Sequence, residues 1–190
     1  MIVRRRRGAE KPRTVILGLD ASLNSTGYAY RADGKIVTGR IRPGEKRGSS
    51  RLWHNLQQLE RILDQVKPDV MVIEGYAMGI KGGRVFHIGE WGGVARLAAW
   101  RRGIKVVTVT PSSLKQIVSG SGAPGKTKLQ QAVTRMYNVT TTQDDELDAL
   151  GLLAVGEALE DARGCPLLNG RLQEVLASSK PGIDSEPGMR

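Results

Sequence analysis

Short aliphatic runs and helically spaced apolar residues alternate along this chain. Two runs, Val15–Leu19 and Val70–Ile73, are almost purely aliphatic, which is typical of strands buried on both faces. Between them, apolar residues from Leu52 to Val66 recur at helical spacing and predict an amphipathic helix. The same patterns predict strands at 14–20, 27–32, 35–41, 69–74 and 104–109, and helices at 50–66, 84–102, 112–118, 126–137 and 143–159.

The order of these segments predicts one α/β domain. Asp33-Gly34 is a strong two-residue hairpin signal, so the second and third strands are expected to form an antiparallel meander with the first. The later strands alternate with helices, which predicts a mixed sheet flanked by helices. We therefore expect a basic arm at 1–13, the folded domain at 14–160 and an accessory tail at 161–190.

The charge pattern predicts a polyanion partner. The chain of 190 residues carries a formal net charge of +10. Residues 75–142 hold ten Lys or Arg against the single acid Glu90, whereas residues 143–160 hold six acids and no Lys or Arg. A basic surface beside concentrated acids indicates a groove for a polyanion with a pocket for cations. The arm, with Arg4–Arg7 in a row, is either a solvated tail or a non-specific phosphate contact.

Several classes of protein are excluded by what the sequence lacks. Cys165 is the only cysteine, so neither a disulfide framework nor a cysteine-based zinc cluster is expected. No apolar run has the roughly 18 residues that a transmembrane helix needs. No apolar stretch follows the basic N-terminus to form a signal peptide. These features predict a soluble, cytoplasmic protein that does not act at a membrane.

Four carboxylates are placed where a sheet of this kind binds ligands. Asp20 and Glu74 each end a buried aliphatic strand, and ligands sit at the carboxyl ends of such strands. Asp145 and Asp148 are three residues apart in one helix and so share a face. Interaction with the helix N-terminus alone explains an acid in the first turn, but not Asp148, which follows it in an apolar segment.

Oxygen ligands without a His or Cys set favour a hard cation such as Mg²⁺ or Mn²⁺ over zinc. Two such ions roughly 4 Å apart can activate a water molecule and stabilise the leaving oxygen in phosphodiester hydrolysis. The basic middle of the chain would hold the DNA or RNA backbone.

The motif order resembles a known family. In the order of its motifs, the chain resembles the RuvC-type Holliday-junction resolvases of the RNase H-like superfamily. These motifs are a strand ending in Asp20, a strand ending in Glu74, a basic segment and the D-x-x-D-A-L motif at Asp145–Leu150. Lys115–Gly122, followed by Lys126, resembles that family's K-Q-x-V-x-G-x-G-x-x-x-K segment. The resemblance covers residues 14–160 and implies an RNase H-like, mixed five-stranded sheet.

The resemblance implies a crossover junction endodeoxyribonuclease that works as a homodimer, binds four-way DNA junctions and nicks two strands symmetrically, leaving 5′-phosphates. It implies Mg²⁺ as cofactor, with Mn²⁺ able to substitute and two ions per active site. The implied metal ligands are Asp20, Glu74, Asp145 and Asp148. Lys115 and Lys126 would approach the scissile phosphate or the neighbouring backbone. A lysine near the scissile phosphate stabilises developing charge; the alternative is an ordinary surface lysine.

Further DNA contacts are expected around the second acid and in the basic segment. The family usually has a Phe three residues after this acid, but here that position is Ala77, so Tyr76 is the candidate for stacking on a base. Lys81, Arg84 and Lys128 are further candidates for DNA binding. In the helix at 84–102, Val94, Leu97, Ala98 and Trp100 are expected to face inward; if Trp91 or Trp100 is exposed instead, it is the candidate dimer contact. The expected location is the nucleoid, or the host cytoplasm if a virus encodes the protein.

Three other functions compete with this one. Asp20 with Ser22, Ser25 and Thr26 loosely resembles a phosphate-binding turn of sugar kinases and actin-like ATPases, but those enzymes need two such domains and a second D-x-G turn. The second is a nuclease of the same fold that cleaves RNA–DNA hybrids or other branched DNA such as flaps. It competes because carboxylates define the chemistry and not the substrate. A catalytically idle junction-binding module is the third.

Overall fold

The computed structural model describes residues 14–75, 84–119 and 126–162. Its strands are β1 (Ile16–Asp20), β2 (Thr26–Ala32), β3 (Lys35–Ile41), β4 (Val70–Glu74) and β5 (Lys105–Val109). Its helices are α1 (Gly48–Val66), α2 (Arg84–Trp100), α3 (Pro111–Ser119), α4 (Lys126–Tyr137) and α5 (Asp144–Ala162). Each corresponds to a predicted segment, with ends that differ by at most three residues. The predicted arm and most of the predicted tail lie outside the described residues.

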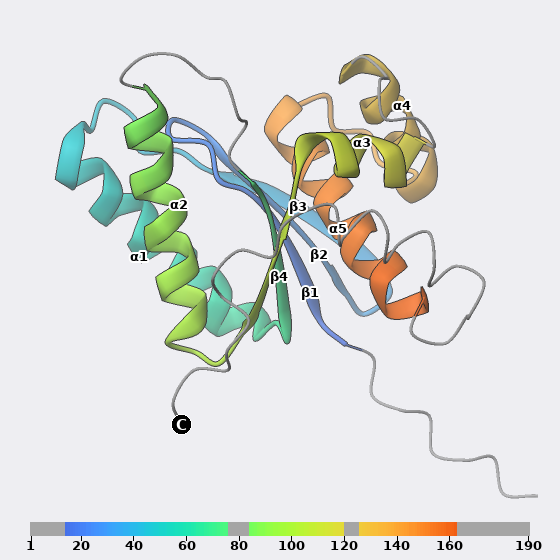
Figure 1. Ribbon diagram of the computed structural model, residues 1–190, viewed down its shortest axis with the longest axis horizontal. Helices are drawn as coiled ribbons and strands as arrows, with labels where there is room; N and C mark the ends of the chain where they lie inside the picture. Colours follow the sequence, from blue (N-terminus) through green and yellow to red (C-terminus); the bar gives the residue numbers. More distant parts are fainter. Residues whose placement is uncertain (1–13, 76–83, 120–125, 163–190) are drawn as a thin grey trace, which may run out of the picture.

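The strands form one mixed sheet in the order β3-β2-β1-β4-β5. β2 is antiparallel to both β1 and β3, whereas β1, β4 and β5 are parallel. The hairpin between β2 and β3 turns at Asp33 and Gly34, whose φ angles of 48° and 76° are those of a type I′ turn. Because β1, β4 and β5 run in one direction, their carboxyl ends meet at one edge of the sheet (Figure 1).

Helices cover both faces of this sheet. α1 and α2 lie on one face, and α3, α4 and α5 lie on the other (Figure 1). Side chains alternate along β1, so that Leu17 and Leu19 pack into the core under α1 and α2, while Ile16 packs into the core under α5. β4 repeats this alternation in the same register, and both strands are therefore aliphatic on each face.

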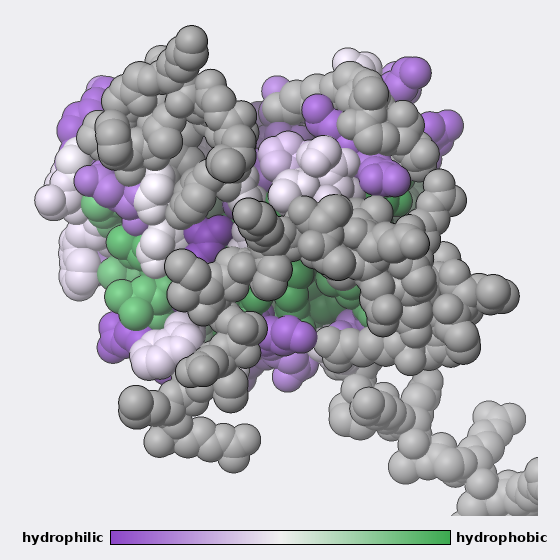
Figure 2. All heavy atoms as spheres, in the orientation of Figure 1, coloured by the Kyte–Doolittle hydropathy of each residue, from purple (hydrophilic) through white to green (hydrophobic). Residues whose placement is uncertain are grey.

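α2 faces the core with a stripe that includes Ala98, as expected, but neither Leu97 nor Trp100. Trp91, Ala95, Ala98 and Ala99 form its buried stripe. Trp91 is completely buried, and its indole N–H donates to Thr26 Oγ1 over 2.9 Å, so the proposal that Trp91 is an exposed dimer contact was wrong. Leu97 and Trp100, both expected inside, are 56% and 41% exposed because they lie off this stripe. Figure 2 shows apolar surface over α2. No helix in ranges 14–75, 84–119 and 126–162 is long and apolar enough to cross a membrane.

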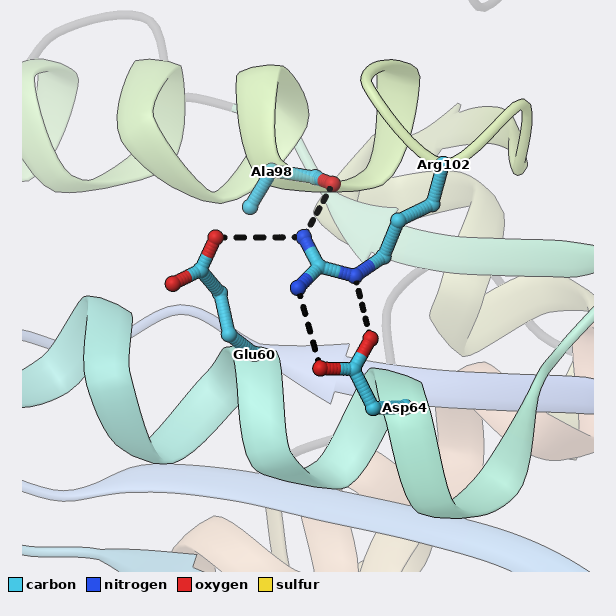
Figure 3. Close-up of polar contacts among 4 residues, drawn as sticks. All are labelled: Glu60, Asp64, Ala98 and Arg102. Atoms are coloured by element: carbon cyan, nitrogen blue, oxygen red, sulfur yellow. Dashed lines mark hydrogen bonds and ion pairs between the residues drawn. The ribbon is translucent and has the colours of Figure 1, made fainter.

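Arg102, in the turn after α2, forms ion pairs with Asp64 and Glu60 of α1, and we call this network the joint between α1 and α2. The Arg102 guanidinium makes two parallel hydrogen bonds to the Asp64 carboxylate, at 2.7 and 3.2 Å (Figure 3). It also donates to Glu60 Oε1 and to the Ala98 carbonyl oxygen, both at 3.2 Å. The hydrogen bond from Arg102 lowers the pKa of Asp64 below its ordinary value. This joint holds the two helices together at the edge of the sheet opposite the carboxyl ends of β1 and β4 (Figure 1).

Candidate active site

β1 and β4 present Asp20 and Glu74 side by side. Leu19 pairs with Ile73 in the parallel register, so the next residues, Asp20 and Glu74, end adjacent strands about 4.8 Å apart. Ile16 and Val72 face α5, and alternation along each strand directs Asp20 and Glu74 to that same face. Asp20 is buried, with 8% of its surface exposed, and Glu74 is partly buried.

α5 crosses this face so closely that glycine is required beneath it. A Cβ on Gly18 of β1 would collide with the Ala149 carbonyl oxygen and lie 2.6 Å from the Leu153 nitrogen. A Cβ on Gly27 of β2 would collide with the Asp145 carbonyl oxygen. Gly27 is the strand partner of Asp20, whereas Gly18 lies two residues earlier on β1. α5 therefore runs antiparallel to β1, and its N-terminal end lies beside Asp20.

This crossing brings Asp145 and Asp148 to the same end and face of the sheet as Asp20 and Glu74. Asp145 sits directly on the strand partner of Asp20, and Asp148 follows one turn later. Both are partly buried. The other acids of the first turn point elsewhere, as expected, because Gln130 donates to Asp144 over 2.8 Å and Glu146 bonds to β3.

Glu146 fastens the N-terminal end of α5 to the sheet, a role that the sequence pattern did not reveal. Thr38 Oγ1 donates to Glu146 Oε2 over 2.8 Å, and Arg40 Nε lies 3.2 Å from Oε1. Both partners are on β3, more than 100 residues earlier in the chain. Arg40 pairs with Gly27, which pairs with Asp20. The contact therefore holds the N-terminal end of α5 level with Asp20 along the strands. No local motif could have predicted a contact between residues so far apart in the chain.

Ser22, in the loop after β1, brings a hydroxyl close to Asp20. Its Oγ lies 3.5 Å from both Asp20 carboxylate oxygens, at the outer limit for a hydrogen bond. Its backbone N–H donates to the Asp20 carbonyl oxygen over 2.9 Å, which turns the chain away from the strand. The sequence pattern places Ser22 only in a kinase-like phosphate-binding turn.

The residue types at this end of the sheet fit a divalent cation. Carboxylate oxygens are the preferred ligands of Mg²⁺ and Mn²⁺, and a cation offsets both their mutual repulsion and the burial of Asp20. As the side chains stand, no group of three or more His, Cys, Asp or Glu in the described ranges is arranged to hold an ion. The backbone brings the four acids together, and rotation about their side-chain torsions sets the distances between their carboxylates.

The predicted DNA-binding residues are placed only in part. Lys115 lies on α3, and Lys128 is exposed on α4. α3 follows β5 directly at the carboxyl edge, and a Cβ on Gly151 of α5 would lie 3.2 Å from Leu114 of α3, so Lys115 belongs to an element packed on α5. Lys126 begins α4 and Arg84 begins α2, but their side chains are outside the description, as are Tyr76 and Lys81 entirely.

Comparisons with known proteins match this chain and its fold to one family. The family model described as "Crossover junction endodeoxyribonuclease RuvC" matches residues 16–156. The RuvC of Protochlamydia amoebophila is 32% identical over 146 residues, which cover 73% of this chain and 87% of that protein. A Thermus thermophilus RuvC structure superposes with a TM-score of 0.68 at 16% identity, covering 78% of this chain and 97% of the other. A second Thermus RuvC structure, "in complex with Holliday junction substrate", gives a TM-score of 0.66 at 16% identity, with coverage of 75% and 92%.

The mixed five-stranded sheet flanked by helices superposes on a RuvC structure and has the RNase H-like fold, which confirms the predicted fold class. The chain belongs to the RuvC family of crossover junction endodeoxyribonucleases. The predicted enzyme class is thereby confirmed. The nucleases of this family depend on metal ions.

Proposed function

We propose that the protein resolves four-way DNA junctions by paired, symmetric, metal-dependent nicking as a homodimer. The observation that carries this proposal is the approach of Asp145 and Asp148 to the strand ends that present Asp20 and Glu74. Membership of the RuvC family supports the substrate, as does the Thermus RuvC solved with a Holliday junction. Because the protein acts on DNA, we place it in the cytoplasm, at the nucleoid or, for a virus-encoded protein, in the host.

In this proposal Asp20, Glu74, Asp145 and Asp148 hold two Mg²⁺ ions, for which Mn²⁺ can substitute. When bound there, such ions would supply an activated water and stabilise the negative charge that develops in phosphodiester hydrolysis. Asp20 is the central ligand because it lies between the other elements, with β4 on one side and the partner strand beneath α5 on the other. Ser22 orients the Asp20 carboxylate through its hydroxyl. Lys126 contributes positive charge near the scissile phosphate.

The remaining contacts in the proposal hold the DNA and the second subunit. Lys115 and Lys128 bind backbone phosphates from α3 and α4, next to α5. Lys81 and Arg84 bind phosphates from the segment after Glu74, where Tyr76 stacks on a base at the junction. The two subunits meet through the outer face of α2, on which Trp100 is 41% exposed.

The decisive experiment incubates the purified protein with Mg²⁺ and a labelled immobile four-way junction, beside duplex, flap and RNA–DNA hybrid controls. Asp20→Asn serves as the blank. We expect symmetric nicks in the junction that are absent with the blank. Preferential cleavage of flaps or hybrids would support the metal site but contradict the proposed substrate. Tight junction binding without nicks in Mg²⁺ or Mn²⁺ would contradict the proposed nuclease activity.

A matched pair of variants on α5 tests the site itself. Asp148→Asn should abolish nicking and weaken Mn²⁺ binding, measured by calorimetric titration in the absence of DNA. Asp161→Asn removes an exposed carboxylate at the other end of the same helix and should leave both unchanged. Equal effects of the two substitutions on Mn²⁺ affinity would contradict the assignment of Asp148 as a ligand.

A further inference from the structure

An exposed basic segment follows β3 and leads into α1. Within Arg42–Arg51, four basic residues accompany one acid, Glu45; the four are Arg42, Lys46, Arg47 and Arg51. All but Pro43 and Arg51 in this segment are exposed. None of its basic residues was among the DNA-binding candidates, because they lie outside the family motifs.

The sheet places this segment beside the carboxylates. β3 runs in the same direction as β1, since both are antiparallel to β2. Asp20 pairs with Gly27 and Gly27 with Arg40, so Arg40 lies two strands from Asp20. Arg42 is two residues further along, beyond the same edge, and its Cα is therefore roughly 12 Å from that of Asp20 by standard strand spacings.

Contacts between α1 and the loop after β1 hold the end of the segment in place. Arg51 Nη1 donates to Asn24 Oδ1 over 3.2 Å, and Asn55 Nδ2 donates to the Leu23 carbonyl oxygen over 3.3 Å. These acceptors belong to the loop that begins directly after Asp20 and includes Ser22. The start of α1 and the end of β1 therefore form one continuous surface.

The local charges at the start of α1 favour an anion. Arg47 is the N-cap residue, makes no side-chain cap bond, and no acid occupies the first turn of α1. Cationic side chains beside the positive end of a helix raise the local potential. The ion pair of Arg47 with Glu45, at 3.5 Å, is formed by side chains that are 68% and 100% exposed, so solvent screens it strongly.

We propose that the segment Arg42–Arg51 binds the phosphate backbone of a duplex arm beside the cleaved strand. This inference rests on the proposed junction-resolving function and deepens it. Lys115 and Lys128 lie on α3 and α4, on the face of the sheet that α5 covers, whereas Arg42–Arg51 follows β3 and leads into α1, which covers the other face (Figure 1). The carboxylates thus stand between two basic surfaces, and the DNA is gripped on both sides of the scissile phosphate.

The test measures the salt dependence of junction affinity in the Asp20→Asn background, which separates binding from cleavage. Each lost phosphate contact should reduce the slope of log K against log salt by about 0.9. We expect the triple substitution R42Q/K46Q/R47Q to reduce this slope by about 2 to 3 and to weaken binding most at low salt. The charge-conserving variant R42K/K46R/R47K should keep the wild-type slope.

A matched control removes three exposed basic residues at the other end of the sheet, where the parallel strands begin. K67Q/R101Q/K105Q changes the net charge equally, at the end of α1, the turn after α2 and the start of β5. Equal slopes for the two triple variants, both folded by thermal unfolding, would overturn the proposal. The proposed function fails separately if the unsubstituted protein neither binds nor nicks the junction.

Discussion

Single glycines set the geometry of the candidate site. Gly27 admits the backbone of α5 at Asp145, and Gly18 admits the next turn. A methyl group at either position occupies space that α5 backbone atoms already fill. The approach of the two acids on α5 to the strand ends therefore depends on residues that carry no chemistry of their own.

Gly27→Ala should weaken both stability and catalysis. The added Cβ would collide with the Asp145 carbonyl oxygen, so the first turn of α5 must move outward. We expect a loss of about 1–3 kcal/mol in the free energy of unfolding, as for other overpacked interiors, and a larger fractional loss of nicking. Urea denaturation and the junction assay measure the two effects.

Gly93→Ala is the control for this substitution. Gly93 is exposed within α2, and nothing lies within 4 Å of a Cβ built on it. Alanine favours the helix by roughly 0.5–1 kcal/mol over glycine, so this variant should be slightly more stable than the wild type. A Gly27→Ala protein that matched Gly93→Ala in stability would contradict the close packing of α5 on β2.

The sequence identified some residues of the candidate site because their signal is local. Asp20 and Glu74 each end an aliphatic run, and the spacing of Asp145 and Asp148 is visible within one helix. The role of Glu146 was missed because its partners, Thr38 and Arg40, lie on a distant strand. Trp91 was misplaced because its hydrogen bond to Thr26 is likewise a tertiary contact.

At the scale of elements, the sequence predicted where strands and helices lie better than which side of a helix is buried. Aliphatic runs and the Asp33-Gly34 turn defined the strands, and apolar spacing defined α1. α2 contains apolar residues on several sides and three glycines, so its periodicity does not single out one buried face. Packing against the sheet determines which face of α2 is buried, and Leu97 lies on the exposed side.

The contact between α5 and β3 should contribute to metal binding as well as stability. Glu146→Ala removes bonds to Thr38 and Arg40, side chains that are held beside a largely buried carboxylate. We expect a loss of about 2 kcal/mol in the free energy of unfolding and a weaker Mn²⁺ affinity, because the end of α5 is no longer fixed over Asp20. A double-mutant cycle with Thr38→Val should show positive coupling between the two side chains.

Glu157→Gln tests the other end of the same helix. Glu157 accepts from Arg31 over 2.8 Å and from the Tyr137 hydroxyl over 2.9 Å, far from the four acids. Its substitution should lower stability without changing Mn²⁺ affinity. Weaker Mn²⁺ binding by both variants to the same degree would show that Glu146 acts through general stability, contrary to our interpretation.

The joint between α1 and α2 should make stability depend on acid pH. Arg102 lowers the pKa of Asp64 in the folded protein from an ordinary value of 3.8. The stabilisation is complete above that value and is lost as the pH falls through the lower, folded-state pKa. Asp64→Asn should therefore destabilise the protein at pH 7 and flatten the fall in stability below about pH 4, as measured by urea denaturation across pH.

Asp33→Asn provides the comparison for this pH dependence. Asp33 is exposed in the hairpin turn, with a φ of 48° that asparagine also tolerates. It removes one carboxylate without touching the joint, so the acid limb of the stability curve should keep the steepness of the wild type. Flattening by Asp33→Asn to the same extent would assign the effect to net charge.

At the scale of the molecule, the exposed apolar face of α2 should control the oligomeric state. Leu97 and Trp100 are 56% and 41% exposed there, on the face of the sheet opposite α5. A large exposed apolar pair in a nuclease that nicks two strands is best explained by a second subunit. Leu97→Glu should shift the protein to a monomer in sedimentation velocity, whereas Met136→Glu, at an equally exposed apolar position on α4, should not.

The same variant separates assembly from chemistry. A monomer keeps its own four carboxylates, so Leu97→Glu should still nick junctions. It should lose the pairing of the two nicks. A supercoiled cruciform plasmid would then yield nicked circles in place of linear product. Each subunit would then act independently, and the second cut would follow only after a new encounter. Paired cutting by a Leu97→Glu protein that sediments as a monomer would contradict a dimer built through α2, and dimeric sedimentation of that variant would place the subunit contact on another face.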